Sequence, residues 1–380
     1  MHTTFWSQVS MAFGVTPILP LLETVVFQSF NSNRHVDMGT MCLLKPSVQA
    51  ITIEFRAVDD RIEEPLRDSF SVCLSSVPHL QKLSLALPVS LLDVTLLPQT
   101  HSNLRQLRID TPCFPHHLGA LAGLSCLEDL SMPLRGLVNS PVHFGRLDRL
   151  GISSFEWIVL EALFAHMDAP RLRALSITTN MDGSNTLRDD CASCMRAVSA
   201  KFPYLTGFHW RYFQTFARKM GYFGDTNVGS PLAELIEPLF ALRNLRSFSY
   251  YFLGPVVPLS SRDMERIAEA WPDLEVFRLH QENDWNYHFD FASIISLARR
   301  CSRIHTLHLP RVQFNPISDN ATVLPQDRLG LRELSIGWIT YPPGSDSDSP
   351  AMTDEELRRR IQEVFPWIYV KLPYHVLSTA

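Results

Sequence analysis

Eight polar or aromatic residues stand at equivalent positions in four successive apolar segments of the second half of the sequence. Their side chains suit binding, because imidazole and guanidinium groups donate hydrogen bonds and a tyrosine ring combines apolar area with a polar hydroxyl group. We expect them to form a surface that binds a protein partner. The alternative is that they are the ordinary polar residues of a solvated sheet face. The eight residues are His209, Arg211, Ser249, Tyr251, Arg278, His280, Thr306 and His308.

The residues that could hold a metal or catalyse a reaction are isolated in the sequence. Cys191-Ala-Ser-Cys194 lacks the second cysteine pair, or the histidines, that a zinc site requires, so we expect it to pack in a helix core. The spacing of His305 and His308 places them on opposite faces of a strand, and His116-His117 has no partner. Motifs of serine hydrolases, nucleotide-binding loops and zinc proteases are missing from the sequence. We therefore expect no catalytic, cofactor-binding or metal-binding residues and no enzyme activity.

Two further groups of residues have both a structural and a functional interpretation. Asp189-Asp190 and Glu355-Glu356 lie near expected helix starts, where the helix dipole stabilises acidic side chains without a catalytic role. Ser345, Ser347 and Ser349 alternate with aspartates, which is compatible with phosphorylation directed by the neighbouring acids. A solvated loop explains the same residues, and the composition favours it.

A recurring apolar pattern supplies the elements that must position the eight residues. Residues 172–180 spell L-x-x-L-x-L-x-x-N, which is the pattern of a leucine-rich repeat. In this repeat the first apolar residue enters a turn and the next two face the core from a short strand. One copy cannot bury its own apolar face, so copies stack, here with a mean period of about 28 residues. The first apolar anchors of the twelve matches are Leu22, Val48, Leu80, Leu104, Leu127, Leu147, Leu172, Leu205, Leu245, Leu274, Ile304 and Leu331.

The alternation of strand and helix patterns predicts an α/β fold. We expect a leucine-rich-repeat solenoid of the ribonuclease-inhibitor type, with a curved parallel sheet on the concave side and helices on the convex side. Ser230-Pro231 and Ser260, the latter with Asp263, are expected to begin two of the helices. The expected helices span residues 66–77, 157–167, 187–202, 232–242, 262–271, 291–301 and 354–365, and a closing strand is expected at 367–372.

The pattern divides the chain into four parts. Residues 1–21 are an N-terminal flank that serves as a partial cap, and residues 22–340 are the array of irregular repeats. Residues 341–352 form a polar loop, and residues 353–380 supply a capping helix and strand. The longest intervals between repeats place extra residues in 211–229, which we expect to form a loop beside the binding face.

Composition limits the partners and the compartment. The 380 residues include 34 basic and 39 acidic side chains, for a formal net charge of -5, so neither nucleic acid nor a membrane is expected as the partner. Seven scattered cysteines are typical of the free thiols of a cytoplasmic or nuclear protein. The N-terminus lacks the basic start of a secretory signal, and no segment approaches the roughly 20 apolar residues that span a bilayer.

The Pro-x-Leu-x-x-Leu-x-Leu entries at Pro78, Pro203 and Pro272, with the helix sequence 261–271, resemble the repeat portion of fungal F-box proteins with leucine-rich repeats. The resemblance covers residues 20–372 and implies that the repeats hold a protein substrate. In that family an F-box helical bundle binds the adaptor of a cullin-RING ubiquitin ligase. Its Leu-Pro-x-Glu start is not visible in the N-terminal flank, so adaptor and cullin are expected as partners only if an F-box lies upstream. The alternative is a stand-alone scaffold or regulatory binding protein with no role in ubiquitin ligation.

Overall fold

The computed structural model describes part of the chain, and its contacts divide the molecule into two compact units. The first unit is Met1–Ser154 with Ala165–Leu172, and the second is Phe155–Phe164 with Arg173–Ala380. Each unit contains its own set of parallel strands. The described residues are 21–29, 46–55, 74–86, 94–180, 187–213, 231–253, 257–281, 290–313, 330–340, 354–365 and 367–372.

In the first unit, strands follow one another side by side in chain order, each parallel to the next. They are β1 (Thr24–Ser29), β2 (Ala50–Phe55), β3 (Lys82–Ala86), β4 (Gln106–Ile109), β5 (Asp129–Pro133) and β7 (Arg149–Ser154). The connections include the 3-10 helix η3 (Val94–Leu96) and the helices α3 (Leu97–Thr100) and α4 (Pro115–Leu121). A separate short pair joins β6 (Val142–His143) to β8 (Met167–Asp168). The pattern of apolar residues did not predict η3, α3, α4, β6 or β8, because each has too few residues to show a period.

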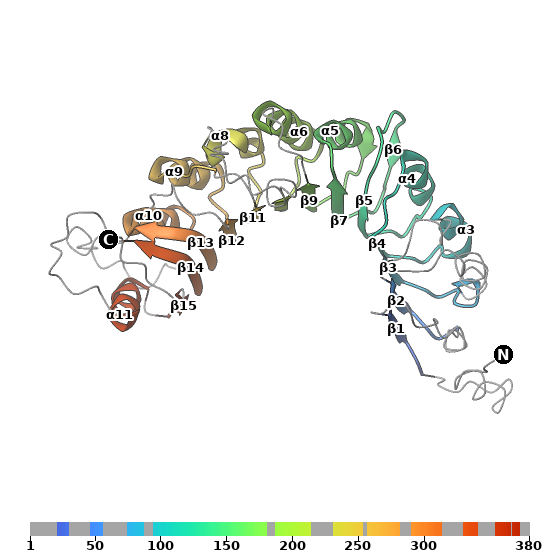
Figure 1. The fold of residues 1–380 in the computed structure, drawn as a ribbon, viewed down its shortest axis with the longest axis horizontal. Helices are drawn as coiled ribbons and strands as arrows, with labels where there is room; N and C mark the ends of the chain where they lie inside the picture. The colour runs from blue at the N-terminus through green and yellow to red at the C-terminus, as the bar shows by residue number, and fades with distance from the viewer. Residues whose placement is uncertain are drawn as a thin grey trace, which may run out of the picture. The chain divides into compact units, whose positions relative to one another are not determined.

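The second unit repeats the same arrangement with longer strands. In order they are β9 (Ala174–Asn180), β10 (Gly207–Phe213), β11 (Ser247–Leu253), β12 (Val276–Gln281), β13 (Thr306–Gln313), β14 (Glu333–Thr340) and β15 (Tyr369–Lys371), each parallel to its neighbour. The connections carry α5 (Trp157–His166), α6 (Leu187–Lys201), α8 (Leu232–Leu235), η4 (Glu237–Ala241), α9 (Ser261–Ala270), α10 (Phe291–Arg300) and α11 (Asp354–Val364). Helices α6, α8, α9 and α10 cover one face of these strands, and the opposite face is open (Figure 1). We call this uncovered side of the second-unit strands the open face.

The apolar anchors predicted from the repeat pattern form the core. From Val48 to Ile336 every anchor, at the first, fourth and sixth positions of its L-x-x-L-x-L match, is at most 5% exposed. In the first match Leu22 and Phe27 are only half-buried, because β1 has a described neighbouring strand on one side only. Parallel strands in chain order, helices on one face and a buried anchor set confirm the α/β leucine-rich-repeat solenoid.

The core under the open face of the second unit is aromatic. The rings of Phe208, Phe248 and Phe277 stack across three neighbouring strands, with centroid distances of 6.1 and 5.7 Å. In the next row Trp210 meets Tyr250 edge to face at 5.0 Å. Such pairs have restricted geometry and bury large areas. The strands that present the open face are therefore held on a closely packed layer.

The predicted helix starts are partly confirmed. The backbone N–H of Asp263 donates to Ser260 Oγ across 3.3 Å, and the backbone N–H of Ser260 donates to Asp263 Oδ2 across 2.8 Å. This reciprocal pair is a capping box and begins α9 as expected. The predicted helix start at residue 232 agrees with α8, but the predicted cap is off by one residue, because Pro231 itself is the N-cap. The N–H of Leu232 instead donates to the carbonyl of Pro258.

The single helix predicted at 232–242 is also wrong. The structure has a short α8 followed by the 3-10 helix η4, with Pro238 in the first turn of η4. Proline has no N–H to continue the hydrogen-bond ladder and its ring crowds the preceding turn, so the α-helix ends before it. The other predicted helices agree to within a residue or two at each described end, and β15 is the expected closing strand. Residues 1–20, 66–73, 214–230 and 341–353 lie outside the described residues, so the flank, most of the first helix, the inserted loop and the polar loop stay predictions.

Within the described residues no helix combines the length and the apolar character needed to cross a membrane.

Candidate protein-binding face

Strand geometry decides which predicted residues share a face. In β10 the side chains of Phe208, Trp210 and Tyr212 are buried, while His209 is half-buried and Arg211 is exposed. Successive side chains on a strand point to opposite sides, so burial of one set places the other on the open face. The same alternation holds along β12, where Arg278 and His280 are exposed between buried neighbours.

The register between strands brings these residues together. His209 lies opposite Ser249, and Ser249 lies opposite Arg278. Two positions further along the strands, Arg211 lies opposite Tyr251, and Tyr251 lies opposite His280. Six of the eight predicted residues therefore occupy a compact area on three adjacent strands. We call this area the central cluster, and it consists of His209, Arg211, Ser249, Tyr251, Arg278 and His280.

His209 and Arg211 are joined by a hydrogen bond inside the central cluster. Arg211 Nε donates to His209 Nε2 across 2.7 Å. A ring nitrogen that accepts a hydrogen bond carries no proton, so the imidazole is neutral and holds its proton on Nδ1. Burial, and then the positive charges of Arg211 and Arg278, lower the pKa of His209 to about 4. Both the hydrogen bond and the pKa describe a neutral histidine between two cations.

The aromatic members of the cluster are ordered by stacking. The rings of Tyr251 and His280 are almost parallel, with an interplanar angle of 3° and centroids 4.5 Å apart. The ring of Phe213 approaches Tyr251 at 6.0 Å from the end of β10. Stacked rings in a fixed orientation offer a flat apolar surface with polar edges.

Thr306 and His308 lie next to the cluster, and both contact an acid of β14. His308 pairs with Arg278 in the register, and its Nε2 is 3.0 Å from Glu333 Oε1. The Thr306 hydroxyl group lies 3.5 Å from Glu333 Oε2 and is only 6% exposed. Sequence reasoning missed Glu333, although it directly precedes the anchor Leu334, a position that the strand alternation also places on the open face.

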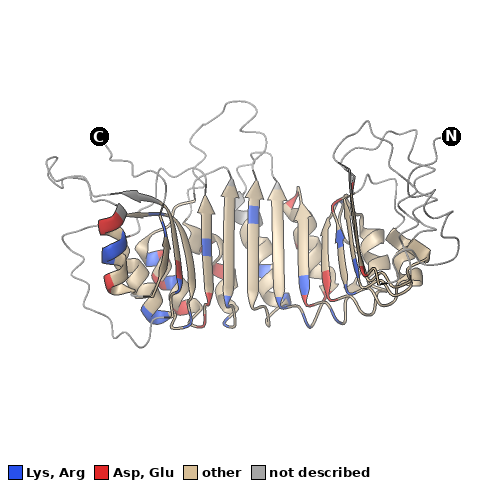
Figure 2. Cartoon of the chain, turned by 90° about the horizontal axis from the view of Figure 1, so that it is seen from below, with Lys and Arg blue, Asp and Glu red and all other residues tan. Residues whose placement is uncertain are grey.

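Ion pairs distinguish two arginines of the cluster from others in the second unit. Arg246 pairs with Glu275 at 3.5 Å, and Arg300 pairs with Glu269 at 2.6 Å. Within the described residues neither Arg211 nor Arg278 has an acidic side chain within 4.0 Å. Figure 2 views the open face. Basic residues appear midway along β10 and β12, whereas acidic residues on the strands appear near the strand starts.

Cys191 and Cys194 lie in the core, whereas the pair His116-His117 lies at the start of α4. Cys191 and Cys194 are fully buried on α6, which confirms the expected core packing. Burial raises the pKa of the Cys194 thiol well above its usual range. His117 lies at the start of α4, where its Nδ1 accepts from the backbone N–H of Phe114 across 3.2 Å. In the described part of the chain no group of three His, Cys, Asp or Glu side chains could hold a metal ion.

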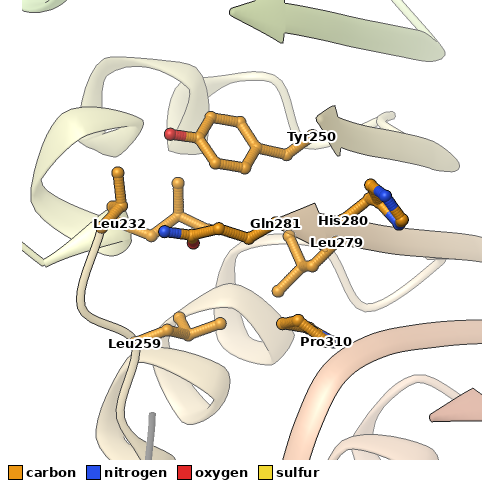
Figure 3. A pocket seen from close by; sticks show the side chains of 8 residues that line it. Leu232, Tyr250, Leu259, Leu279, His280, Gln281 and Pro310 are labelled. Carbon is orange, nitrogen blue, oxygen red and sulfur yellow. The ribbon is translucent and has the colours of Figure 1, made fainter. Parts of the chain in front are cut away.

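One small cavity lies beside the cluster, on the core side of β11 and β12. Its volume is about 10 Å³, which is room for roughly one water molecule. Figure 3 shows Tyr250 on one side of the cavity and the side chain of Gln281 in the middle of the view. Leu232, Leu259 and Pro310 lie around them. A small-molecule ligand needs a cavity at least an order of magnitude larger. The open face, and not this cavity, is the candidate site.

The inserted loop predicted at 211–229 has only its first residues in the structure. Arg211 to Phe213 belong to β10 and not to a loop, because they continue the pairing of β10 with β11. Residues 214–230 lie outside the described residues, and a contribution from them to binding stays a prediction.

No family model matches the sequence. No curated protein matches it. Among solved structures, an internalin from Listeria monocytogenes is similar over 94% of this chain and 88% of that chain, with 13% sequence identity and a TM-score of 0.41. Values this low carry no inference about ligand or function. The assignment of this chain to the leucine-rich-repeat fold rests on its own strands, helices and buried anchors.

Proposed function

We propose that the open face of the second unit binds another protein. One observation carries the proposal, namely the register that brings His209, Arg211, Tyr251, Arg278 and His280 from three strands into one area. Binding energy at protein interfaces concentrates in arginine and aromatic residues. The packed aromatic layer beneath holds the strands in place, so little conformational freedom is lost when a partner binds.

The remaining three predicted residues complete the face. Ser249 lies between His209 and Arg278 and is only 9% exposed. Thr306 and His308 are already bonded to Glu333, so we assign them a role in the shape of the face and not in donating new hydrogen bonds.

The test is affinity purification of the tagged chain in three forms. They are the wild type, the double variant Tyr251→Ala with Arg278→Glu, and the control Arg300→Glu on α10, which covers the opposite face. We expect a reproducible set of proteins with the wild type and the control, and loss of that set with the double variant. The same set recovered with all three forms would rule out the open face as the binding site. Circular dichroism of each form checks that the fold is retained.

We propose more narrowly that the bound protein is a substrate of a cullin-RING ubiquitin ligase, in the cytoplasm or the nucleus. The support is the resemblance of the repeat entries at Pro78, Pro203 and Pro272 to F-box proteins with leucine-rich repeats. For this test the chain is expressed together with any coding sequence upstream of Met1. We expect the ligase adaptor and cullin to be recovered with it. Their absence from that sample leaves a stand-alone scaffold and overturns the narrower proposal.

A further inference from the structure

The central cluster has a chemical bias that limits what can bind there. The guanidinium groups of Arg211 and Arg278 and the imidazole ring of His209 offer hydrogen-bond donors. The one acceptor among these groups, His209 Nε2, is already occupied by Arg211. A guanidinium group has no acceptor, and His209 keeps its remaining ring proton on Nδ1 because Nε2 accepts from Arg211. Ser249 lies between His209 and Arg278 in the strand register and adds a hydroxyl group. Such a surface fits a ligand group that has acceptors and no donors.

Charge points in the same direction. Arg211 and Arg278 have no acidic partner among the described residues, whereas Arg246 and Arg300 of the same unit do. The two arginines lie on β10 and β12, with the uncharged β11 between them. Neighbouring parallel strands are about 4.8 Å apart and each residue advances the strand by about 3.3 Å. Arg211 lies two strands away from Arg278 and two positions further along, so their backbone positions are separated by roughly 12 Å. Two carboxylates on one extended segment can therefore reach both guanidinium groups.

The surroundings favour a short acidic segment over a long anionic polymer. Glu275 and Glu333 lie at or beside the strand starts of β12 and β14, close to the same area. The formal net charge of the chain is -5. A nucleic acid would carry a phosphate every few ångströms, whereas the central cluster offers two arginines that have no acidic partner among the described residues. A protein segment can instead carry its acids only where the arginines are, and place an apolar residue on the Tyr251–His280 stack.

We infer that the central cluster recognises a segment of a partner protein rich in aspartate and glutamate, whose carboxylates bond Arg211 and Arg278. This inference rests on the proposed function and names the chemistry of the partner. Carboxylate–guanidinium pairs are often bidentate, which fixes the orientation of the segment as well as its charge.

The test uses the full chain and a short fluorescent peptide of alternating glutamate and leucine, followed by fluorescence anisotropy. A matched peptide with glutamine in place of glutamate is the charge control. We expect the acidic peptide to bind and the amide peptide to bind about tenfold more weakly or not at all. Arg211→Gln and Arg278→Gln should each weaken the acidic peptide about tenfold, while Arg300→Gln should leave its affinity unchanged.

A charge exchange keeps the test independent of folding. Arg278→Glu should lose the acidic peptide and bind a lysine-for-glutamate peptide better than the wild type does. Equal binding of the acidic and amide peptides, or equal losses in Arg278→Gln and Arg300→Gln, would overturn the inference. Displacement of the acidic peptide by a single-stranded oligonucleotide of equal charge at the same concentration would also overturn it, because it would show general anion binding. If the acidic peptide fails to bind while recovery of partner proteins in the affinity purification still depends on Tyr251 and Arg278, the open face binds protein segments that are not acidic. The proposed function then stands without this inference.

Discussion

Arg211 Nε donates a hydrogen bond to His209 Nε2 across 2.7 Å, from a position two residues further along β10. The pair links the strand pattern to the electrostatics of the open face. Alternation places both side chains on the same side, and the bond holds the imidazole neutral beside a positive charge.

The pKa of His209 should respond to its neighbours. Burial contributes most to its value of about 4, followed by Arg211 and then Arg278. Arg211→Gln removes one positive charge and its hydrogen bond, so the pKa of His209 should rise toward the ordinary value of about 6.5 without reaching it. An NMR titration of the imidazole proton resonances measures the change. Arg300→Gln is the control, and an unchanged pKa in Arg211→Gln would contradict the assigned hydrogen bond.

His101 should make the first unit sensitive to acid. It is fully buried, neither ring nitrogen has a hydrogen-bond partner among the residues that the structure describes, and burial lowers its pKa. Above the ordinary pKa of about 6.5 the histidine is neutral in both the folded and unfolded chains. As the pH falls through that value the unfolded chain takes up the proton first, so the free energy of unfolding falls until the folded pKa is reached.

His101→Leu removes this proton uptake and should reduce the loss of stability between about pH 7.5 and about pH 5. Urea denaturation of wild type and variant at both pH values gives the comparison. His116→Gln, at an exposed position of α4, should keep the wild-type loss. The prediction for His101 fails if His101→Leu and wild type lose the same stability.

Gly337 should be intolerant of any side chain. A methyl group built on it would collide with the carbonyl oxygen of Pro310 on the neighbouring strand β13. Backbone atoms of a paired strand cannot move aside, so Gly337→Ala should lower the free energy of unfolding by about 1–3 kcal/mol. Gly119 is the matched control, because in the described part of the chain, beyond its chain neighbours and its own helix backbone, no heavy atom lies within 4 Å of a methyl group there. On α4, Gly119→Ala should raise stability by about 0.5–1 kcal/mol, and chemical denaturation measures both.

The cysteines should differ in reactivity with iodoacetamide. Cys194 and Cys301 are fully buried, and burial raises the pKa of the Cys301 thiol to about 12. The thiolate is the reactive form, so both should be modified only as fast as the fold opens. Cys126 is partly exposed and should be modified first of the three. Site-resolved mass spectrometry over time distinguishes them, and early labelling of Cys194 in folded protein would contradict its placement in the core.

The sequence alone determined the local features of this protein. The spacing of apolar residues within each repeat predicted the strands and their buried anchors, because side chains on a strand alternate whatever lies beside it. The same alternation placed His209 with Arg211, and Arg278 with His280, on the face away from the core. The capping box of Ser260 and Asp263 was also visible, since it involves residues three apart in the chain.

Only the tertiary structure decided how residues from different repeats meet. Tyr251 meets His280, and His308 meets Glu333, only through the register between strands whose paired residues are 25 to 29 positions apart. The connections between strands differ in length, so the sequence leaves that register open. The neutral state of His209 likewise depends on burial and on Arg278 two strands away. Burial and charge act through distances in space, whereas the repeat pattern records only distances along the chain.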